Sequence, residues 1–264
     1  IITVPADQIV ASNGLLVNEI ELGDGRKQYH WEERYPICTY LVSVTSYPYL
    51  VWGDTYVSMD GDTMPIVFYN YPDQVAIADD NYLLTKDMIG AFAQRFGEYP
   101  FINEKYGHAD FGRGGGMEHQ TLSSMGGHSQ WLIAHELGHQ WWGDLLTCAS
   151  FHHIWLNEGF ARYCEAIWEE SHNGVDAYKS YWESHTFYGP GTIYVEDPSS
   201  VGQIFNGNLS YNKAGWVVHM LRGVMGDNLF FETMKSYASN DSLAYNAVTT
   251  ENFQAVCEDV SGLD

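Results

Sequence analysis

The most informative stretch of this chain is the sequence HELGH at residues 135–139. Two histidines four positions apart on a helix lie about 40° apart around its axis, so the imidazoles of His135 and His139 can reach one cation from the same face. Glu136 lies beside them and is poorly placed to bind that cation. Its carboxylate is therefore free to accept a proton from water at the metal, which is the task of a general base.

The third ligand is expected in a second stretch, NEGFA at residues 157–161. A glutamate on a following helix completes a His, His, Glu set whose fourth position stays open, as catalytic zinc sites require. Glu158 is placed for this role, and we predict one Zn2+ per chain. The alternative is a structural cluster, because buried histidines beside a glutamate can satisfy one another. The apolar flanks at 129–133 and 140–142 would bury both histidines. Buried polar groups need partners, and a zinc ion would be a partner for both.

Composition and charge exclude several classes of protein. The 264 residues are 45% hydrophobic and 15% aromatic, which indicates a globular protein with one large domain or two modest ones. The 34 acidic and 12 basic residues give a net charge of -22, which disfavours nucleic acid and anionic membranes as partners. This charge suits an exported protein, so we expect a secreted, periplasmic or cell-envelope location.

The cysteines and the hydropathy pattern add two expectations. Cys38, Cys148, Cys164 and Cys257 form no C-x-x-C pair, so either a disulfide such as Cys148 to Cys164 or four buried thiols would fit. No apolar run is long enough to span a membrane. The chain begins at Ile1 in a β-like pattern, so we expect it to be a piece of a longer precursor.

Residues 1–72 are predicted to be the C-terminal part of an N-terminal β-sheet domain. Runs rich in β-branched and aromatic residues predict antiparallel strands over 15–22, 27–32, 38–47 and 65–69. Turn signals such as Asn13-Gly14 separate these runs.

After residue 72 the apolar period becomes helical, and residues 73–264 are predicted to form a second domain. Thr250 is expected to cap the last helix and Gly262 to end it. A loop is expected over 187–208. Helices are predicted over 79–96, 128–146, 157–171, 175–186, 212–225, 228–239 and 250–260.

Four segments in this order resemble the aminopeptidase N family of zinc aminopeptidases, which are gluzincins with a thermolysin-like catalytic domain. The resemblance implies an α+β fold, in which residues 73–264 form a catalytic domain with a mixed sheet and a mainly helical lobe. The opening strands, around 10–14 and 31–45, resemble the end of the family's saddle-like β domain. GGMEH at 115–119 is similar to the family's G-x-M-E-N motif, HELGH with Glu158 to its zinc motif, and SYNK at 210–213 to the segment bearing its catalytic tyrosine.

The resemblance implies a hydrolase that cleaves the N-terminal bond of peptides. His135, His139 and Glu158 would hold zinc, and Glu136 would act as base. The Tyr211 hydroxyl would donate a hydrogen bond to the oxyanion formed when the scissile carbonyl is attacked. The alternative for Tyr211, one of 19 tyrosines, is ordinary packing at a helix start.

The GGMEH segment would recognise the substrate. The Glu118 carboxylate would pair with a free α-amino group and so place the first peptide bond at the zinc. Gly115 and Gly116, with Met117, would offer backbone to an extended peptide. His119 stands where the family more often has asparagine, and a histidine that titrates near neutrality would make binding pH-dependent. The alternatives are a surface glutamate and a simple glycine turn.

Glu165 lies seven residues after Glu158 and thus on the same helix face. It is a candidate outer acceptor for a ligand histidine, or else an exposed helix glutamate.

Three rival functions stay open at this point. A zinc endopeptidase would cleave amino-blocked peptides without needing Glu118. A related branch of the family hydrolyses a lipid epoxide at this site, and a non-catalytic scaffold could keep the fold. The expected partners are peptides with a free N-terminus, and the resemblance implies that a C-terminal helical domain of the same precursor is missing from this chain.

Overall fold

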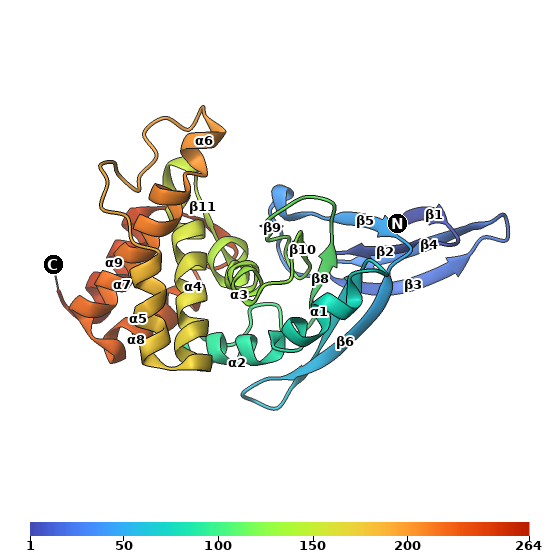
Figure 1. Cartoon of the computed structure of the whole chain (residues 1–264), viewed down its shortest axis with the longest axis horizontal. Coiled ribbons are helices and arrows are strands. Elements are labelled where there is room, and N and C mark those ends of the chain that lie inside the picture. The colour runs from blue at the N-terminus through green and yellow to red at the C-terminus, as the bar shows by residue number, and fades with distance from the viewer. Residues whose placement is uncertain (264) are drawn as a thin grey trace. The chain divides into compact units, whose positions relative to one another are not determined.

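The computed structural model describes residues 1–263, and the chain divides into two compact units (Figure 1). The first unit contains residues 1–90 and 99–136, and the second contains 91–98 and 137–264. The first unit holds the large sheet and the second is mainly helical, so the predicted α+β class is confirmed.

The chain opens with two small antiparallel sheets in the first unit. One has the order β1-β4-β3 and the other pairs β2 with β5. The strands predicted over 15–22 and 27–32 are confirmed, but the predicted strand 38–47 begins with a 3-10 turn, Thr39–Leu41, and becomes extended only in β5. The strands are β1 (Ile2–Pro5), β2 (Ile9–Ser12), β3 (Leu15–Glu21), β4 (Arg26–Glu32) and β5 (Val44–Tyr47).

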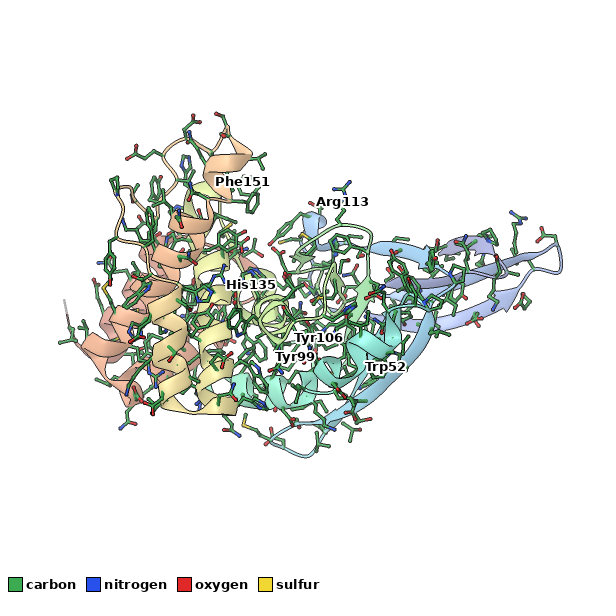
Figure 2. The ribbon with its side chains drawn as sticks, viewed as in Figure 1. Trp52, Tyr99, Tyr106, Arg113, His135 and Phe151 are labelled. Atoms are coloured by element: carbon green, nitrogen blue, oxygen red, sulfur yellow. The ribbon has the colours of Figure 1, made fainter. Side chains whose placement is uncertain are left out.

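A five-stranded mixed sheet forms the core of the first unit, in the order β6-β7-β8-β10-β9. Its strands are β6 (Leu50–Val57), β7 (Thr63–Asn70), β8 (Tyr106–Asp110), β9 (Gly116–Met117) and β10 (Ser123–Met125). β8 runs parallel to β7 and β10, and the other pairs are antiparallel. Tyr99 and Tyr106, labelled in Figure 2, have ring centroids 5.9 Å apart beside the sheet. The sheet joins strands from both sides of residue 72, and the domain boundary proposed there stays a prediction.

The single helix predicted over 79–96 is wrong, because two helices occupy this region. They are α1 (Val75–Tyr82) and α2 (Thr85–Phe96), separated by a turn in which the Leu84 N–H donates to the Asn81 carbonyl. Tyr82 and Ile89 are both buried, so the apolar period runs through the break and gives no sign of it.

The helices of the second unit pack around α4 (Trp155–Asn173), which contacts α5 (Val175–Ser184) and α7 (Ala214–Met225) (Figure 1). α8 (Asp227–Ala238) packs on α9 (Thr250–Ser261), while β11 (Leu146–Cys148) pairs in parallel with β12 (Asn246–Val248).

Helix ends in this unit lie close to the predicted ones. Thr249, rather than Thr250, caps α9 in a capping box with Asn252, because the hydroxyl one position earlier accepts the free N–H of the first turn. Gly262 ends the helix with φ 67°, as predicted. The region predicted as loop contains one short helix, α6 (Val201–Ile204).

The cysteines contradict the disulfide alternative. In the part of the chain that the structure describes, none of the four cysteines forms a disulfide; Cys164 is buried, whereas Cys38, Cys148 and Cys257 are half-buried. Over residues 1–263, none of the helices has the length and hydropathy needed to cross a membrane.

Candidate metal centre and active site

The helix that bears the two histidines, α3 (Gln130–Gly138), is shorter than the predicted 128–146. His139 follows with helical angles, but Trp142 (φ -114°, ψ 71°) and Gly143 (φ 154°) leave the helix. Only glycine adopts the Gly143 conformation readily. The bend turns the Trp142 carbonyl back toward His139, whose Nδ1 donates to it at 3.0 Å. The other ring nitrogen, Nε2, is therefore the one available to a metal.

Two of the three predicted ligands come together in the second unit, where His139 Nε2 is 3.4 Å from Glu158 Oε2. His135 precedes His139 by about one helical turn, so it can join them in a candidate metal-binding group. Donors bound tetrahedrally to zinc at about 2.1 Å are separated by about 3.4 Å. His139 and Glu158 are buried and His135 is half-buried (labelled in Figure 2). The donor set and its spacing fit zinc.

Glu158 reaches His139 because their two helices approach unusually closely. A β-carbon on Gly138 would lie 2.7 Å from Cβ and 2.8 Å from Sγ of Cys164 on α4. Side chains do not tolerate such contacts, so glycine at 138 permits the approach. Gly138, the residue before the second histidine of HELGH, thus sets the spacing between the predicted ligands His139 and Glu158.

Glu136 is covered by β9. A β-carbon on Gly116 would lie 2.2 Å from Glu136 Oε1, so the backbone of this strand passes directly over the carboxylate. Gly115 has φ 79° and its carbonyl accepts from the Gly126 N–H at 2.8 Å, which holds the turn into the strand. The two glycines therefore do more than form a simple tight turn.

Glu118 joins this group. Its carboxylate lies within 4.8 Å of the Glu136 carboxylate. Glu118 is half-buried, and its role in recognising the amine stays a prediction. Two neighbouring carboxylates create a local negative potential that favours a cation such as a protonated amine.

Met117 and His119 flank Glu118 and are half-buried. His119 Nδ1 lies 2.9 Å from Ser124 Oγ, so this histidine is bound to the neighbouring strand. Burial lowers the pKa of His119 below its ordinary value. The cause is a partly dry site, which disfavours the charged imidazole. The pH dependence expected of substrate binding stays a prediction.

Tyr211 lies in the π-helical turn η4 (Gly207–Lys213) that leads into α7. The Arg162 guanidinium is 5.8 Å from its ring centroid. Arg162 lies one turn after Glu158 on α4, so the ring of Tyr211 is beside the face of α4 that bears this ligand. Lys213 holds the turn by donating to the carbonyls of Gly189 and Gly191 at 3.0 and 2.7 Å.

Glu165 is buried, which contradicts the exposed alternative. Its Oε2 accepts from Arg162 Nη1 at 3.0 Å and from the Tyr181 hydroxyl at 2.9 Å. Through Arg162 it belongs to the surroundings of Tyr211, and its role as acceptor for a ligand histidine stays a prediction.

The family described as "Peptidase family M1 domain" matches residues 117–264, a stretch that contains Glu118, the three ligands and Tyr211. The chain belongs to the M1 peptidase family. The resemblance to aminopeptidase N is thereby confirmed, and the family implies zinc at the His, His, Glu site.

Similar proteins agree with this M1 assignment. Aminopeptidase M1-C of Oryza sativa subsp. japonica is 34% identical over 146 residues, which are 49% of this chain and 16% of the relative. Glutamyl aminopeptidase of Homo sapiens is 25% identical over 296 residues, which cover 99% of this chain and 30% of the relative. The chain thus spans well under half the length of these curated relatives.

Solved structures extend the agreement to the fold of the M1 domain. A zinc metallopeptidase from Deinococcus radiodurans, bound to a Tyr-Ser-Ala substrate, superposes with a TM-score of 0.85 at 26% identity, covering 99% of this chain and 60% of that one. Aminopeptidase A of Legionella pneumophila, in complex with aspartic acid, superposes with a TM-score of 0.88 at 20% identity, covering 97% of this chain and 32% of that one. At this identity the likeness shows the fold alone.

Two contacts in this M1 domain had no signal in the sequence. The Trp142 carbonyl that orients His139 depends on the bend at Gly143, and Arg162 reaches Tyr211 only because η4 packs on α4. Gly143 gave the only available hint, since a glycine soon after a helix can mark its end.

Proposed function

We propose that this M1 domain is a zinc aminopeptidase that removes the N-terminal residue of peptides. The observation that carries the proposal is the position of Glu118, whose carboxylate lies within 4.8 Å of that of Glu136. An acidic group at this position binds a free α-amino group and leaves room for one residue before the scissile bond.

In this proposal one zinc ion per chain is held by His135, His139 and Glu158, where it supplies a Lewis acid and an acidified water. Glu136 accepts a proton from the attacking water and returns it to the leaving amine. The close cover of Gly116 supports this role, because it restricts the carboxylate to one position.

Tyr211 is proposed to donate its hydroxyl hydrogen to the oxyanion that develops on the scissile carbonyl. The neighbouring Arg162 guanidinium supports this role, because a positive charge 5.8 Å from the ring favours negative charge nearby. Gly115 and Gly116 are proposed to bind the peptide backbone, and Met117 and His119 to hold the segment in place.

The test compares aminoacyl fluorogenic amides with their N-acetylated counterparts, using protein whose zinc content is measured and a chelator-treated control. We expect zinc-dependent cleavage of the free-amine set alone. Cleavage of the blocked set would favour an endopeptidase, and zinc-replete protein without turnover on either set would favour a scaffold. No observation in the described residues favours epoxide hydrolysis.

We also propose that the chain works as part of a longer, exported precursor with a helical domain after it. Its small share of the relatives' length and its net charge of -22 support this. Expression of the complete precursor with a C-terminal tag, followed by cell fractionation, would test it, and tagged protein confined to the cytoplasm would contradict export.

A further inference from the structure

We propose that the Asn13-Gly14 turn positions Glu118 and thereby sets the preference for a free α-amino group. The inference rests on the proposed function. Asn13 and Gly14 lie outside the stretch 117–264 matched by the M1 family. Every contact that carries it lies within the first compact unit.

Asn13 is buried, and both ends of its side-chain amide are in use. Its Nδ2 donates to the Leu41 carbonyl at 3.0 Å and to the Gln120 carbonyl at 2.5 Å, while its Oδ1 accepts from the Ser43 N–H at 2.6 Å. A buried amide with three such bonds has one orientation. It therefore ties Gln120 to the strand segment around residue 43.

Gly14 adds a second tie. Its N–H donates to Thr121 Oγ1 at 2.9 Å. The residue has φ 68°, and a β-carbon there would lie 2.1 Å from the Glu32 carbonyl oxygen. Only glycine fits this turn, which brings the backbone of residue 14 against Thr121.

Thr121 is held in a conformation that a β-branched residue rarely adopts. Its φ is 62°, and over the described part of the chain only Tyr245 shares a positive φ among non-glycine residues. The buried Lys105 donates to the Thr121 carbonyl and hydroxyl at 3.2 and 3.3 Å. A strained residue of this kind persists where its surroundings fix it, and such residues cluster at functional sites.

The constraint reaches Glu118 through two tight turns. The His119 N–H donates to the Met117 carbonyl at 2.9 Å, and the Leu122 N–H donates to the His119 carbonyl at 3.0 Å. With residues 117–122 folded this tightly, fixing Gln120 and Thr121 fixes Glu118 beside Glu136. Asn13 and Gly14 are thus positioning residues that act through the segment they hold.

The test uses two zinc-binding ligands that differ only in the amine, leucine hydroxamate and its des-amino analogue, 4-methylpentanohydroxamic acid. Binding of each to the zinc-loaded protein is measured by calorimetry, which needs no turnover. Asn13→Asp keeps the shape and the bond from the Ser43 N–H but turns two donations into repulsive oxygen contacts. We expect Asn13→Asp to weaken the binding of leucine hydroxamate about tenfold and that of the des-amino analogue less than about twofold.

Matched variants separate positioning from general damage. Asn18→Asp makes the same change at an exposed position on β3 and should alter neither affinity. Thr121→Ala should reproduce the Asn13→Asp result. Thr121→Ser keeps the hydroxyl and should bind leucine hydroxamate as tightly as the parent protein. The inference would be overturned if folded, zinc-replete Asn13→Asp and Thr121→Ala proteins bound both hydroxamates equally more weakly than the parent. It would also be overturned if neither variant changed either affinity.

Glu118→Ala tests the proposed function separately. It should abolish the difference between the two hydroxamates. If that difference survives in Glu118→Ala, the proposed role of Glu118 fails whatever Asn13 does. If Glu118→Ala abolishes the difference in affinity, and both Asn13→Asp and Thr121→Ala retain it, only the positioning inference fails.

Discussion

Gly116 lies so close to Glu136 that no β-carbon fits between them, since the nearest carboxylate oxygen would be 2.2 Å away. The proposed base is thus confined on one side by main chain. Catalytic groups must be held within about 0.5 Å of their working geometry, so this contact should matter for rate.

Replacing Gly116 by alanine should displace the Glu136 carboxylate. We expect kcat to fall by about 100-fold, as for other misplaced catalytic groups, while zinc content is retained. Gly114→Ala is the matched control, because a β-carbon at 114 meets nothing within 4 Å. Steady-state kinetics with metal analysis would decide, and full turnover in Gly116→Ala would contradict the confinement of Glu136.

Glu136→Gln should retain zinc and lose most hydrolysis, because the amide keeps the size of the side chain but cannot accept the proton. We expect a loss of at least about 100-fold in kcat with KM changed little. Single-turnover measurements on zinc-replete protein would check it. Undiminished turnover would remove Glu136 as the base.

The N-terminal end of α3 is fastened to the sheet through Asp110. His128 Nε2 donates to Asp110 Oδ1 at 2.9 Å, and the same carboxylate accepts from Asn70 Nδ2 and from the Tyr71 N–H. His128→Ala should leave a buried carboxylate short of a donor and lower the free energy of unfolding by about 1–3 kcal/mol.

His30→Ala, at an exposed position on β4, controls for loss of an imidazole. Chemical unfolding of both variants tests the contact. If His128→Ala and His30→Ala unfold at the same denaturant concentration, the contact contributes nothing to stability.

Glu33 should make stability depend on pH. Burial and the neighbouring Glu104 carboxylate raise the pKa of Glu33 to about 8. A carboxyl whose pKa is raised on folding stabilises the folded chain fully below its unfolded value, about 4.3, and loses that contribution as the pH rises toward 8.

Glu33→Gln mimics the protonated carboxyl. The variant should match the parent near pH 4 and exceed it by about 1–2 kcal/mol above pH 8, a figure reduced for partial exposure. Unfolding curves across this pH range would test it, and a parent protein more stable than Glu33→Gln at pH 8.5 would contradict the assignment.

Removal of zinc should lower stability as well as activity, because His139 and Glu158 are buried with their donor atoms 3.4 Å apart. At a free zinc concentration 100 times the dissociation constant, binding adds about 2.7 kcal/mol. Thermal unfolding with and without a chelator, and after readdition of zinc, would measure it. An unchanged melting temperature would show that the site does not bind zinc in the folded protein.

Local features of the chain were predicted well where a single element decides them. The helices around Glu158 and the cap at Gly262 follow from periodicity and from helix-end chemistry. The break between α1 and α2 was not predicted, because the apolar period continues across it. The end of α3 was not predicted either, because the bend at Gly143 is stabilised by contacts with other elements.

The placement of His135 and His139 on one helix face follows from their spacing in the sequence, because local helical geometry fixes it, and with Glu158 this pair predicted the metal site. The groups that surround these side chains are visible only in the folded chain: Gly116 over Glu136, the Trp142 carbonyl on His139, and Asn13 on Gln120. These contacts depend on how distant segments pack, and the pattern of residue types along the chain does not encode packing distances that differ by less than the size of one methyl group.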